Sequence, residues 1–186
     1  MRLLETDIPD VLLLEPDVHG DERGFFLEYF HSARFKENGL ASSFVQLNHS
    51  RSEKGILRGL HYQLEQPQGK LVQVITGEVF DVAVDIRKGS PTFGHWTGHI
   101  LSERNHNQLY VPPGFAHGFC VLSDSADFLY LCTDLYRPGD EYGIAWDDPE
   151  LDITWPDGPF KLSDKDKANP TLSAAAEVLP QFKVGV

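Results

Sequence analysis

The chain has few cysteines, few basic residues and no long apolar run, and each shortage excludes a class of protein. Only two cysteines occur among 186 residues, Cys120 and Cys132, and both lie in apolar runs where a thiol is usually a small buried hydrophobe. A disulfide framework is therefore not expected. No apolar stretch approaches the length needed to cross a bilayer, so we expect no membrane-spanning segment.

Basic residues are outnumbered, because 16 Lys and Arg stand against 28 Asp and Glu and give a formal net charge of −12. Nucleic-acid grooves and anionic membrane surfaces both require basic patches, so neither is expected as a partner. Acids and proline interrupt the apolar residues of the N-terminal segment, which prevents a signal-peptide core, and a cytoplasmic protein is predicted. Local arginines still allow a small anionic ligand.

Short apolar runs separated by Gly, Pro, Asp and Asn fill most of the chain and predict an antiparallel all-β sandwich or barrel. The length favours a single domain over residues 1–186. Two short helices are predicted, one capped by Ser32 and ending before Gly39, and one following Ser163. The alternating run VITGEVFDVAVDI, residues 74–86, predicts a hairpin with a tight turn at Gly77-Glu78.

The segment VPPGFAHGF, residues 111–119, resembles the second half of the signature of cupins, which are double-sheet jelly rolls. A metal-binding cupin also carries two histidines and a carboxylate near its first motif. The corresponding run here, GILRGLHYQ at residues 55–63, supplies only His61. Because a transition-metal site needs three or four converging ligands and His61 with His117 offers two, no metal is expected.

Several long segments in order resemble the dTDP-4-dehydrorhamnose 3,5-epimerase family: DERGFFLEYF, FVQLNHS, GILRGLHYQ, PQGKLVQVITGEVFDVAVDIRKGSPTFGHW, VPPGFAHGF, YLCTDLY, GIAWDDPELDITWP and LSDKD. The match runs from about Leu3 to Asp166. It implies an all-β, cupin-like jelly roll with a few short helices, a homodimer that exchanges strands, and no metal or organic cofactor. It also implies conversion of dTDP-4-dehydro-6-deoxyglucose to dTDP-4-dehydro-rhamnose.

Inverting a carbon beside a ketone requires a base on one face and an acid on the other. His61 suits the base, because imidazole accepts a proton near neutral pH. The resemblance implies that Asp166 holds the other ring nitrogen, which fixes the tautomer. It assigns Tyr130 as the acid, since a phenol is protonated at neutral pH. Lys70 is assigned to the enolate oxygen, where fixed charge is a large catalytic contribution.

The substrate-binding positions that the resemblance implies are Arg23, Phe25, Glu28, Gln46, Asn48, Arg58, His117 and Tyr136. An arginine fork suits the oxygens of a diphosphate, which fits Arg23 and Arg58. The amides of Gln46 and Asn48 alternate onto one strand face and suit the edge of thymine. The resemblance gives Tyr136 the role of stacking on the base.

Taken singly, these residues have plainer interpretations. A histidine in a strand is more often structural, and Tyr130 and Tyr136, six residues apart, would be core aromatics on one strand face. Many family members have lysine after the acid tyrosine, whereas this chain has Leu131. That departure leaves open an epimerase of C3 or C5 alone. A non-catalytic nucleotide-sugar-binding jelly roll and a metal-dependent cupin are the further alternatives.

Overall fold

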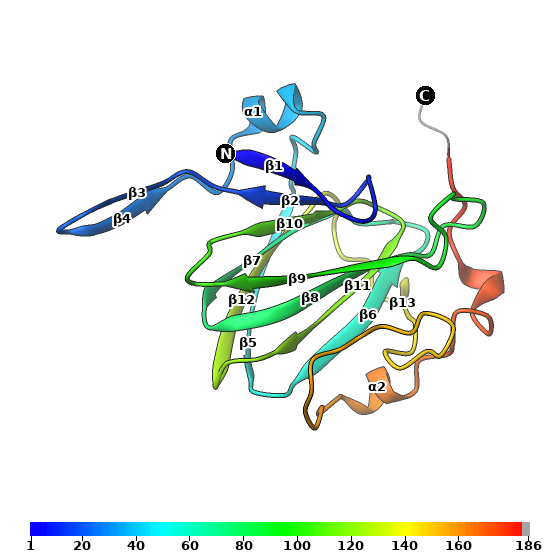
Figure 1. The fold of residues 1–186 in the computed structure, drawn as a ribbon. Coiled ribbons are helices and arrows are strands. Elements are labelled where there is room, and N and C mark those ends of the chain that lie inside the picture. Colours follow the sequence, from blue (N-terminus) through cyan, green and yellow to red (C-terminus); the bar gives the residue numbers. More distant parts are fainter. Residues whose placement is uncertain (184–186) are drawn as a thin grey trace.

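The computed structural model describes residues 1–183, and two antiparallel sheets face each other in it as a double-sheet jelly roll (Figure 1). The six-stranded sheet has the order β1 (Arg2–Glu5), β2 (Leu12–Glu15), β10 (Gln108–Val111), β7 (Lys70–Thr76), β12 (Ser125–Cys132) and β5 (Gln46–Glu53). The five-stranded sheet has the order β13 (Glu141–Gly143), β6 (Leu57–Gln63), β11 (Phe115–Val121), β8 (Glu78–Asp85) and β9 (Trp96–Ser102). The predicted fold class is confirmed.

The main core lies between the two sheets and is built from the apolar residues that alternate along their strands. Its members include Val72 of β7, Val79 of β8, Leu101 of β9 and Phe128 of β12, each almost fully buried. Both cysteines are buried free thiols, as expected. A polar side chain on an inward-facing strand position therefore lies either in this core or in a cavity within it.

The predicted hairpin at Gly77-Glu78 is wrong, although the turn itself is present. β7 ends at Thr76 and β8 begins at Glu78, yet the two strands belong to different sheets. Gly77 has a φ of 83°, and the chain crosses there from the six-stranded sheet to the five-stranded one. Alternation marks both strands but does not identify the partner of either, so the sequence pattern favoured the simpler connection.

The helices are as short as predicted, with one cap misplaced. Helix α1 (Ser32–Glu37) is capped by His31, whose ring accepts from the Arg34 amide, because His31 is extended and Ser32 is already helical. Helix α2 (Asp164–Lys167) is capped by Ser163, as predicted. A 3-10 turn, η1 (Ala176–Val178), follows. Within residues 1–183 no helix has the length and apolarity needed to span a membrane.

A hairpin arm formed by β3 (Val18–Asp21) and β4 (Gly24–Leu27) projects away from the two sheets (Figure 1). Among residues 1–183 the two strands pair only with each other. The side chains of Phe25 and Phe26 on this arm are 62% and 71% exposed. A lone two-stranded hairpin is marginal in water, and exposed apolar patches often mark sites of contact with other molecules.

Candidate active site

A cavity of about 400 Å³ is lined by strands of both sheets. It receives residues from β5, β7 and β12 on one side and from β6, β11 and β13 on the other. The predicted site residues that line it are Gln46, Asn48, Arg58, His61, Lys70, His117, Tyr130 and Tyr136. The fold thus brings together residues that are up to 90 positions apart in the chain.

His61 and Asp166 form a histidine–carboxylate pair at one wall of this cavity. His61 lies on β6, and its Nε2 is 2.5 Å from Oδ1 of Asp166 in the first turn of α2. Burial acts to raise the pKa of Asp166, but the hydrogen bond and charge of His61 outweigh it, so the pKa of this carboxyl is lowered. Asp166 therefore remains an anion at neutral pH and keeps the proton on Nε2, which leaves Nδ1 to accept a proton.

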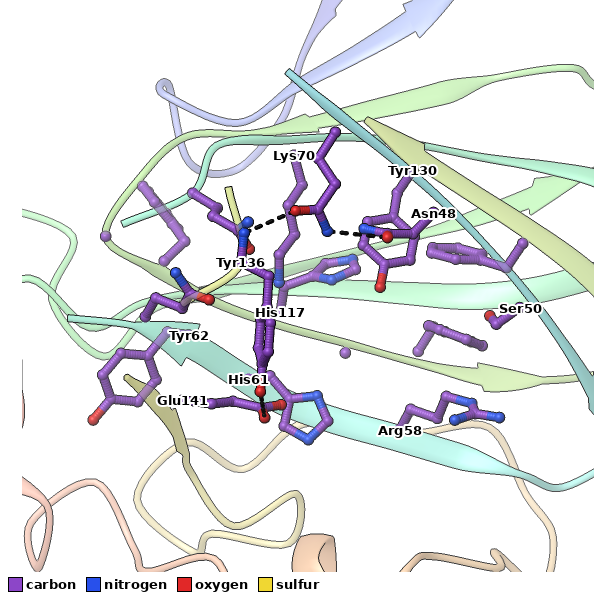
Figure 2. A pocket seen from close by; sticks show the side chains of 18 residues that line it. Asn48, Ser50, Arg58, His61, Tyr62, Lys70, His117, Tyr130, Tyr136 and Glu141 are labelled. Carbon is purple, nitrogen blue, oxygen red and sulfur yellow. Dashed lines mark hydrogen bonds between the residues drawn. The ribbon is translucent and has the colours of Figure 1, made fainter. Parts of the chain in front are cut away.

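Tyr130 faces His61 from the opposite sheet (Figure 2). It lies on β12, where it pairs with Asn48 of β5 and Val72 of β7. Burial raises the pKa of its phenol above the ordinary value, so the group stays protonated well beyond neutral pH. A base on one wall and a proton donor on the other match the requirement for inverting a carbon between them.

Lys70 of β7 and Arg58 of β6 supply positive charge to the cavity. Burial lowers the pKa of Lys70, because the charged form is desolvated. Arg58 donates from Nε to Oγ of Ser52 at 3.0 Å. Within residues 1–183 neither cation is ion-paired with a carboxylate. Both are therefore available to anionic oxygens of a ligand.

His117 is fixed by a second carboxylate, the fully buried Asp81 of β8. Its Nε2 lies 2.9 and 3.0 Å from the two oxygens of Asp81. Within the β11–β6 ladder His117 is the register partner of His61. The two histidines thus belong to one cavity but have separate carboxylate partners.

A chain of amide hydrogen bonds runs along β5 to the segment that follows β12. Asn48 accepts from Nε2 of Gln46 at 3.0 Å, and Oε1 of Gln46 accepts from the backbone N–H of Tyr136 at 2.8 Å (Figure 2). Tyr136 lies beyond the end of β12 and is 47% exposed, so it is not a core aromatic on the face of Tyr130. Its position leaves a ring face open to a stacking partner.

Glu141 is the clearest site residue that the sequence analysis missed. It lines the cavity from β13, accepts from the Tyr136 hydroxyl at 3.1 Å, and pairs with Lys165 of α2 at 2.5 Å. Burial acts to raise the pKa of Glu141, but Lys165 and His61 lower it overall. β13 joins the sheet by pairing with β6, a long-range contact for which no local pattern gives a signal. Other lining residues that the sequence analysis missed are Ser50, Tyr62, Gln63, Gln68, Phe115, Gly118, Phe119 and Phe128.

Arg23, Phe25 and Glu28 were expected in the same site, but within a single chain they do not line this cavity. Arg23 pairs with Asp21 at the tip of the arm, and Glu28 pairs with Arg34. The ring of Phe25 lies 4.7 Å from that of His106. The physical reason is that β3 and β4 form a separate two-stranded sheet in the described part of the chain, which holds these residues away from the cavity. Their binding role stays a prediction.

The described side chains of the cavity do not form a metal site. Within residues 1–183 no group of three or more His, Cys, Asp or Glu side chains is arranged to hold an ion. The Nε2 atoms of His61 and His117 each face an aspartate. The described residues thus offer a proton-transfer site and no closed ligand set.

The double-sheet jelly roll and its histidine–aspartate pair opposite a tyrosine define the class as a jelly-roll protein whose cavity is equipped for acid–base chemistry. The family model for dTDP-4-dehydrorhamnose 3,5-epimerase matches residues 5–174. The chain belongs to this family, and it is an isomerase.

Known relatives support the assignment. A dTDP-4-dehydrorhamnose 3,5-epimerase of Shigella flexneri is 58% identical over 168 residues, covering 89% of this chain and 93% of that protein. A counterpart from Neisseria gonorrhoeae is 54% identical over 98% of this chain, which spans only 56% of that relative's length. The solved dTDP-6-deoxy-D-glucose 3,5-epimerase of Legionella pneumophila, in complex with dTDP-4-keto-L-rhamnose, has a TM-score of 0.96 at 54% identity, covering 98% of this chain and 99% of that one.

Proposed function

We infer that this protein inverts C3 and C5 of dTDP-4-dehydro-6-deoxyglucose, as a step in making dTDP-L-rhamnose. The observation that carries this inference is the pair His61–Asp166 on one wall of the cavity with Tyr130 on the other. C3 and C5 both flank the C4 ketone, so a proton on either carbon is acidic enough for a histidine base. One site can therefore serve both carbons in two rounds.

In each round of catalysis one proton is removed from a carbon and another proton is added to the same carbon. Nδ1 of His61 takes the C–H proton, and the electron pair of that bond moves into an enolate whose negative charge rests on O4. The ammonium of Lys70 stabilises this oxygen. Tyr130 then gives its phenolic proton to the same carbon from the opposite face, which inverts it. The imidazolium and the phenolate return to their starting states by exchange with water.

We further propose that the nucleotide is held along the same cavity. Arg58, which has no carboxylate partner in the described chain, suits the diphosphate oxygens. The linked amides of Gln46 and Asn48 suit the thymine edge, and Tyr136 suits its face. His117, fixed by Asp81, suits a sugar hydroxyl. These contacts account for the binding of an anion by an acidic protein.

A homodimer is proposed to complete the site. The arm carries Arg23, Phe25 and Glu28 away from its own cavity and exposes two aromatic rings. The outer strand of the six-stranded sheet, β5, leaves Leu47 60% exposed. In a symmetric pair the arm of each chain would cover apolar surface of the other and bring these three residues to the partner's cavity. Homodimerisation also explains why the strands of the arm form a separate two-stranded sheet and leave two phenylalanines largely exposed.

The decisive experiment is proton NMR of dTDP-4-dehydro-6-deoxyglucose in deuterium oxide with the purified protein. Loss of both the C3 and C5 proton signals is expected, because each protonation delivers solvent deuterium. Loss of one signal would instead identify an epimerase of a single carbon, the alternative that Leu131 leaves open. Loss of neither would leave a non-catalytic nucleotide-sugar-binding protein.

A matched pair of variants tests the assigned base. His61→Asn removes the acceptor nitrogen and should abolish exchange at both carbons. His95→Asn changes an exposed histidine that does not line the cavity and should leave exchange unchanged. Exchange that survives in His61→Asn would show that another group takes the proton.

A further inference from the structure

An aromatic pair forms an apolar wall of the cavity. Phe119 of β11 and Phe128 of β12 come from opposite sheets, and their ring centroids lie 4.1 Å apart with planes inclined by 17°. The two side chains are only 5% and 1% exposed, yet both line the cavity. Proton transfer and nucleotide binding, as described above, use neither ring. The wall therefore calls for a separate explanation.

This aromatic pair lies close to the groups that are proposed to act on the reacting carbon. The ring of Phe128 lies 6.0 Å from that of Tyr130, two residues further along β12. It also lies 6.2 Å from the ring of His117, which is the register partner of His61. The aromatic pair thus adjoins the proposed proton donor directly, and it adjoins the strand neighbour of the proposed base in the same cavity. A substituent one bond away from the reacting carbon is in position to touch the wall.

The wall offers no hydrogen bond to such a substituent. The phenyl side chains of the wall carry no N–H, O–H or carbonyl group with which to bind a hydroxyl. A hydroxyl group placed there would lose its hydration without a new partner, which costs free energy. A methyl group placed there would gain by leaving water.

We propose that Phe119 and Phe128 recognise the C6 methyl group of the sugar and make the enzyme selective for 6-deoxy over 6-hydroxy hexoses. C6 is bonded to C5, which is one of the two inverted carbons, so it lies one bond from the point of proton transfer. This inference rests on the proposed function. It adds a specificity role for two residues that take no part in the chemistry.

The test compares two stable ligands that differ in one oxygen atom, dTDP-6-deoxyglucose and dTDP-glucose, by isothermal titration calorimetry with the unaltered protein. The 6-deoxy ligand should bind about 10-fold to 100-fold more tightly, the range over which an apolar pocket rejects an added hydroxyl. Equal dissociation constants would overturn the proposal, whatever the variants below do.

Substitutions at Phe119 separate polarity from volume. Phe119→Asn places an amide in the wall and should reduce the preference to near unity, whereas Phe119→Leu keeps the wall apolar and should retain it. Phe93→Asn, at a partly exposed ring outside the cavity, is the matched control and should keep the full preference. A full preference in a folded Phe119→Asn would overturn the proposal. Thermal melting of each variant establishes that it is folded.

The outcome is distinguishable from failure of the proposed function. If deuterium enters C3 and C5 of the substrate but both ligands bind equally, only the selectivity inference fails. If no deuterium enters either carbon, the epimerase function fails independently of the binding ratio.

Discussion

Asp166 reaches His61 from the first turn of α2, where Ser163 accepts its backbone N–H at 3.1 Å. Its lowered pKa means that the carboxylate is charged at every pH at which the enzyme is expected to work. In the proposed mechanism this charge has two effects on the imidazole of His61. It fixes the proton on Nε2, and it stabilises the imidazolium that forms when Nδ1 takes a proton.

Asp166→Asn should lower the turnover number for C5 deuterium exchange by about 10²-fold to 10⁴-fold, since an amide no longer enforces the tautomer or neutralises the imidazolium. The Michaelis constant should change little. Asp164→Asn is the matched control, because Asp164 lies in the same turn, is exposed and pairs only with Lys167. A loss in Asp166→Asn no larger than in this control would remove Asp166 from the mechanism.

Lys70 gives a prediction for the alkaline side of the pH profile. Its pKa is lowered by burial, so its positive charge is lost at a lower pH than that of an ordinary lysine. The pKa of Tyr130 is raised, so the phenol stays protonated at that pH. The fall of kcat/KM at high pH should therefore follow Lys70. Lys70→Arg keeps the charge and should move this fall to higher pH, even if the maximum rate drops.

The control for this profile is Lys54→Arg, at an exposed turn lysine outside the cavity. Its high-pH limb should coincide with that of the unaltered protein. An unshifted limb in Lys70→Arg would mean that another group controls the alkaline loss of activity, and that the charge of Lys70 is not what the enolate requires.

How far the site could be predicted depends on the kind of contact that positions each residue. The family resemblance placed Gln46, Asn48 and His61 in the site. Strand alternation puts the two amides on one face, but taken alone a histidine in a strand is more often structural. The position of Glu141 depends on β13 pairing with β6, a contact between segments about 80 residues apart. Short motifs record the chemistry of a residue, whereas long-range pairing decides which residues meet.

The crossover between β7 and β8 shows the same distinction for whole elements. Both strands were predicted from period-two alternation, which depends only on the burial of every second residue. Their assignment to different sheets depends on which neighbours complete each ladder, and local alternation carries no information on that. The short helix α2 was predicted because its cap, Ser163, is a local signal.

Gly77 should be indispensable to this crossover. Its φ of 83° is unfavourable for a side chain, and a Cβ there would lie 2.1 Å from the carbonyl oxygen of Ser125. Gly77→Ala should therefore lower the melting temperature far more than Gly89→Ala. Gly89 has a φ of 86° with nothing within 4 Å of the added carbon, so its substitution costs only the backbone strain, about 1–2 kcal/mol. Equal melting temperatures in the Gly77→Ala and Gly89→Ala variants would show that the chain removes the clash between the added Cβ and the Ser125 carbonyl oxygen without loss of stability.

The net charge of the whole molecule does not describe the charge inside the cavity, which Lys70 and Arg58 line. Acids outnumber bases by 28 to 16, yet Lys70 and Arg58 have no carboxylate ion-pair partner in residues 1–183. Net charge therefore excludes extended polyanions but not a nucleotide diphosphate. We propose that residues 1–186 act as one domain, and that the two sheets are complete in each chain while the site is not.

Mixing two inactive variants tests whether the arm of one chain completes the site of another. His61→Asn removes the proposed base from the cavity and leaves the arm unchanged. Arg23→Ala removes a charged side chain from the arm and leaves the cavity unchanged. In a mixed dimer, the cavity of the second variant receives the arm of the first and becomes one complete site. Refolding the two variants together in equal amounts should restore about one quarter of the unaltered activity, because half of the dimers are mixed and each has one working site.

Two controls make this result specific. Each variant refolded alone should stay at its own low activity, and the two mixed without refolding should give only their average at first. Size-exclusion chromatography should show a dimer in every sample. Activity that never exceeds the average, in a mixture shown to contain mixed dimers, would place Arg23 outside the partner's cavity. The arm would then stabilise the pair through Phe25 and Phe26, and each chain would carry a whole site.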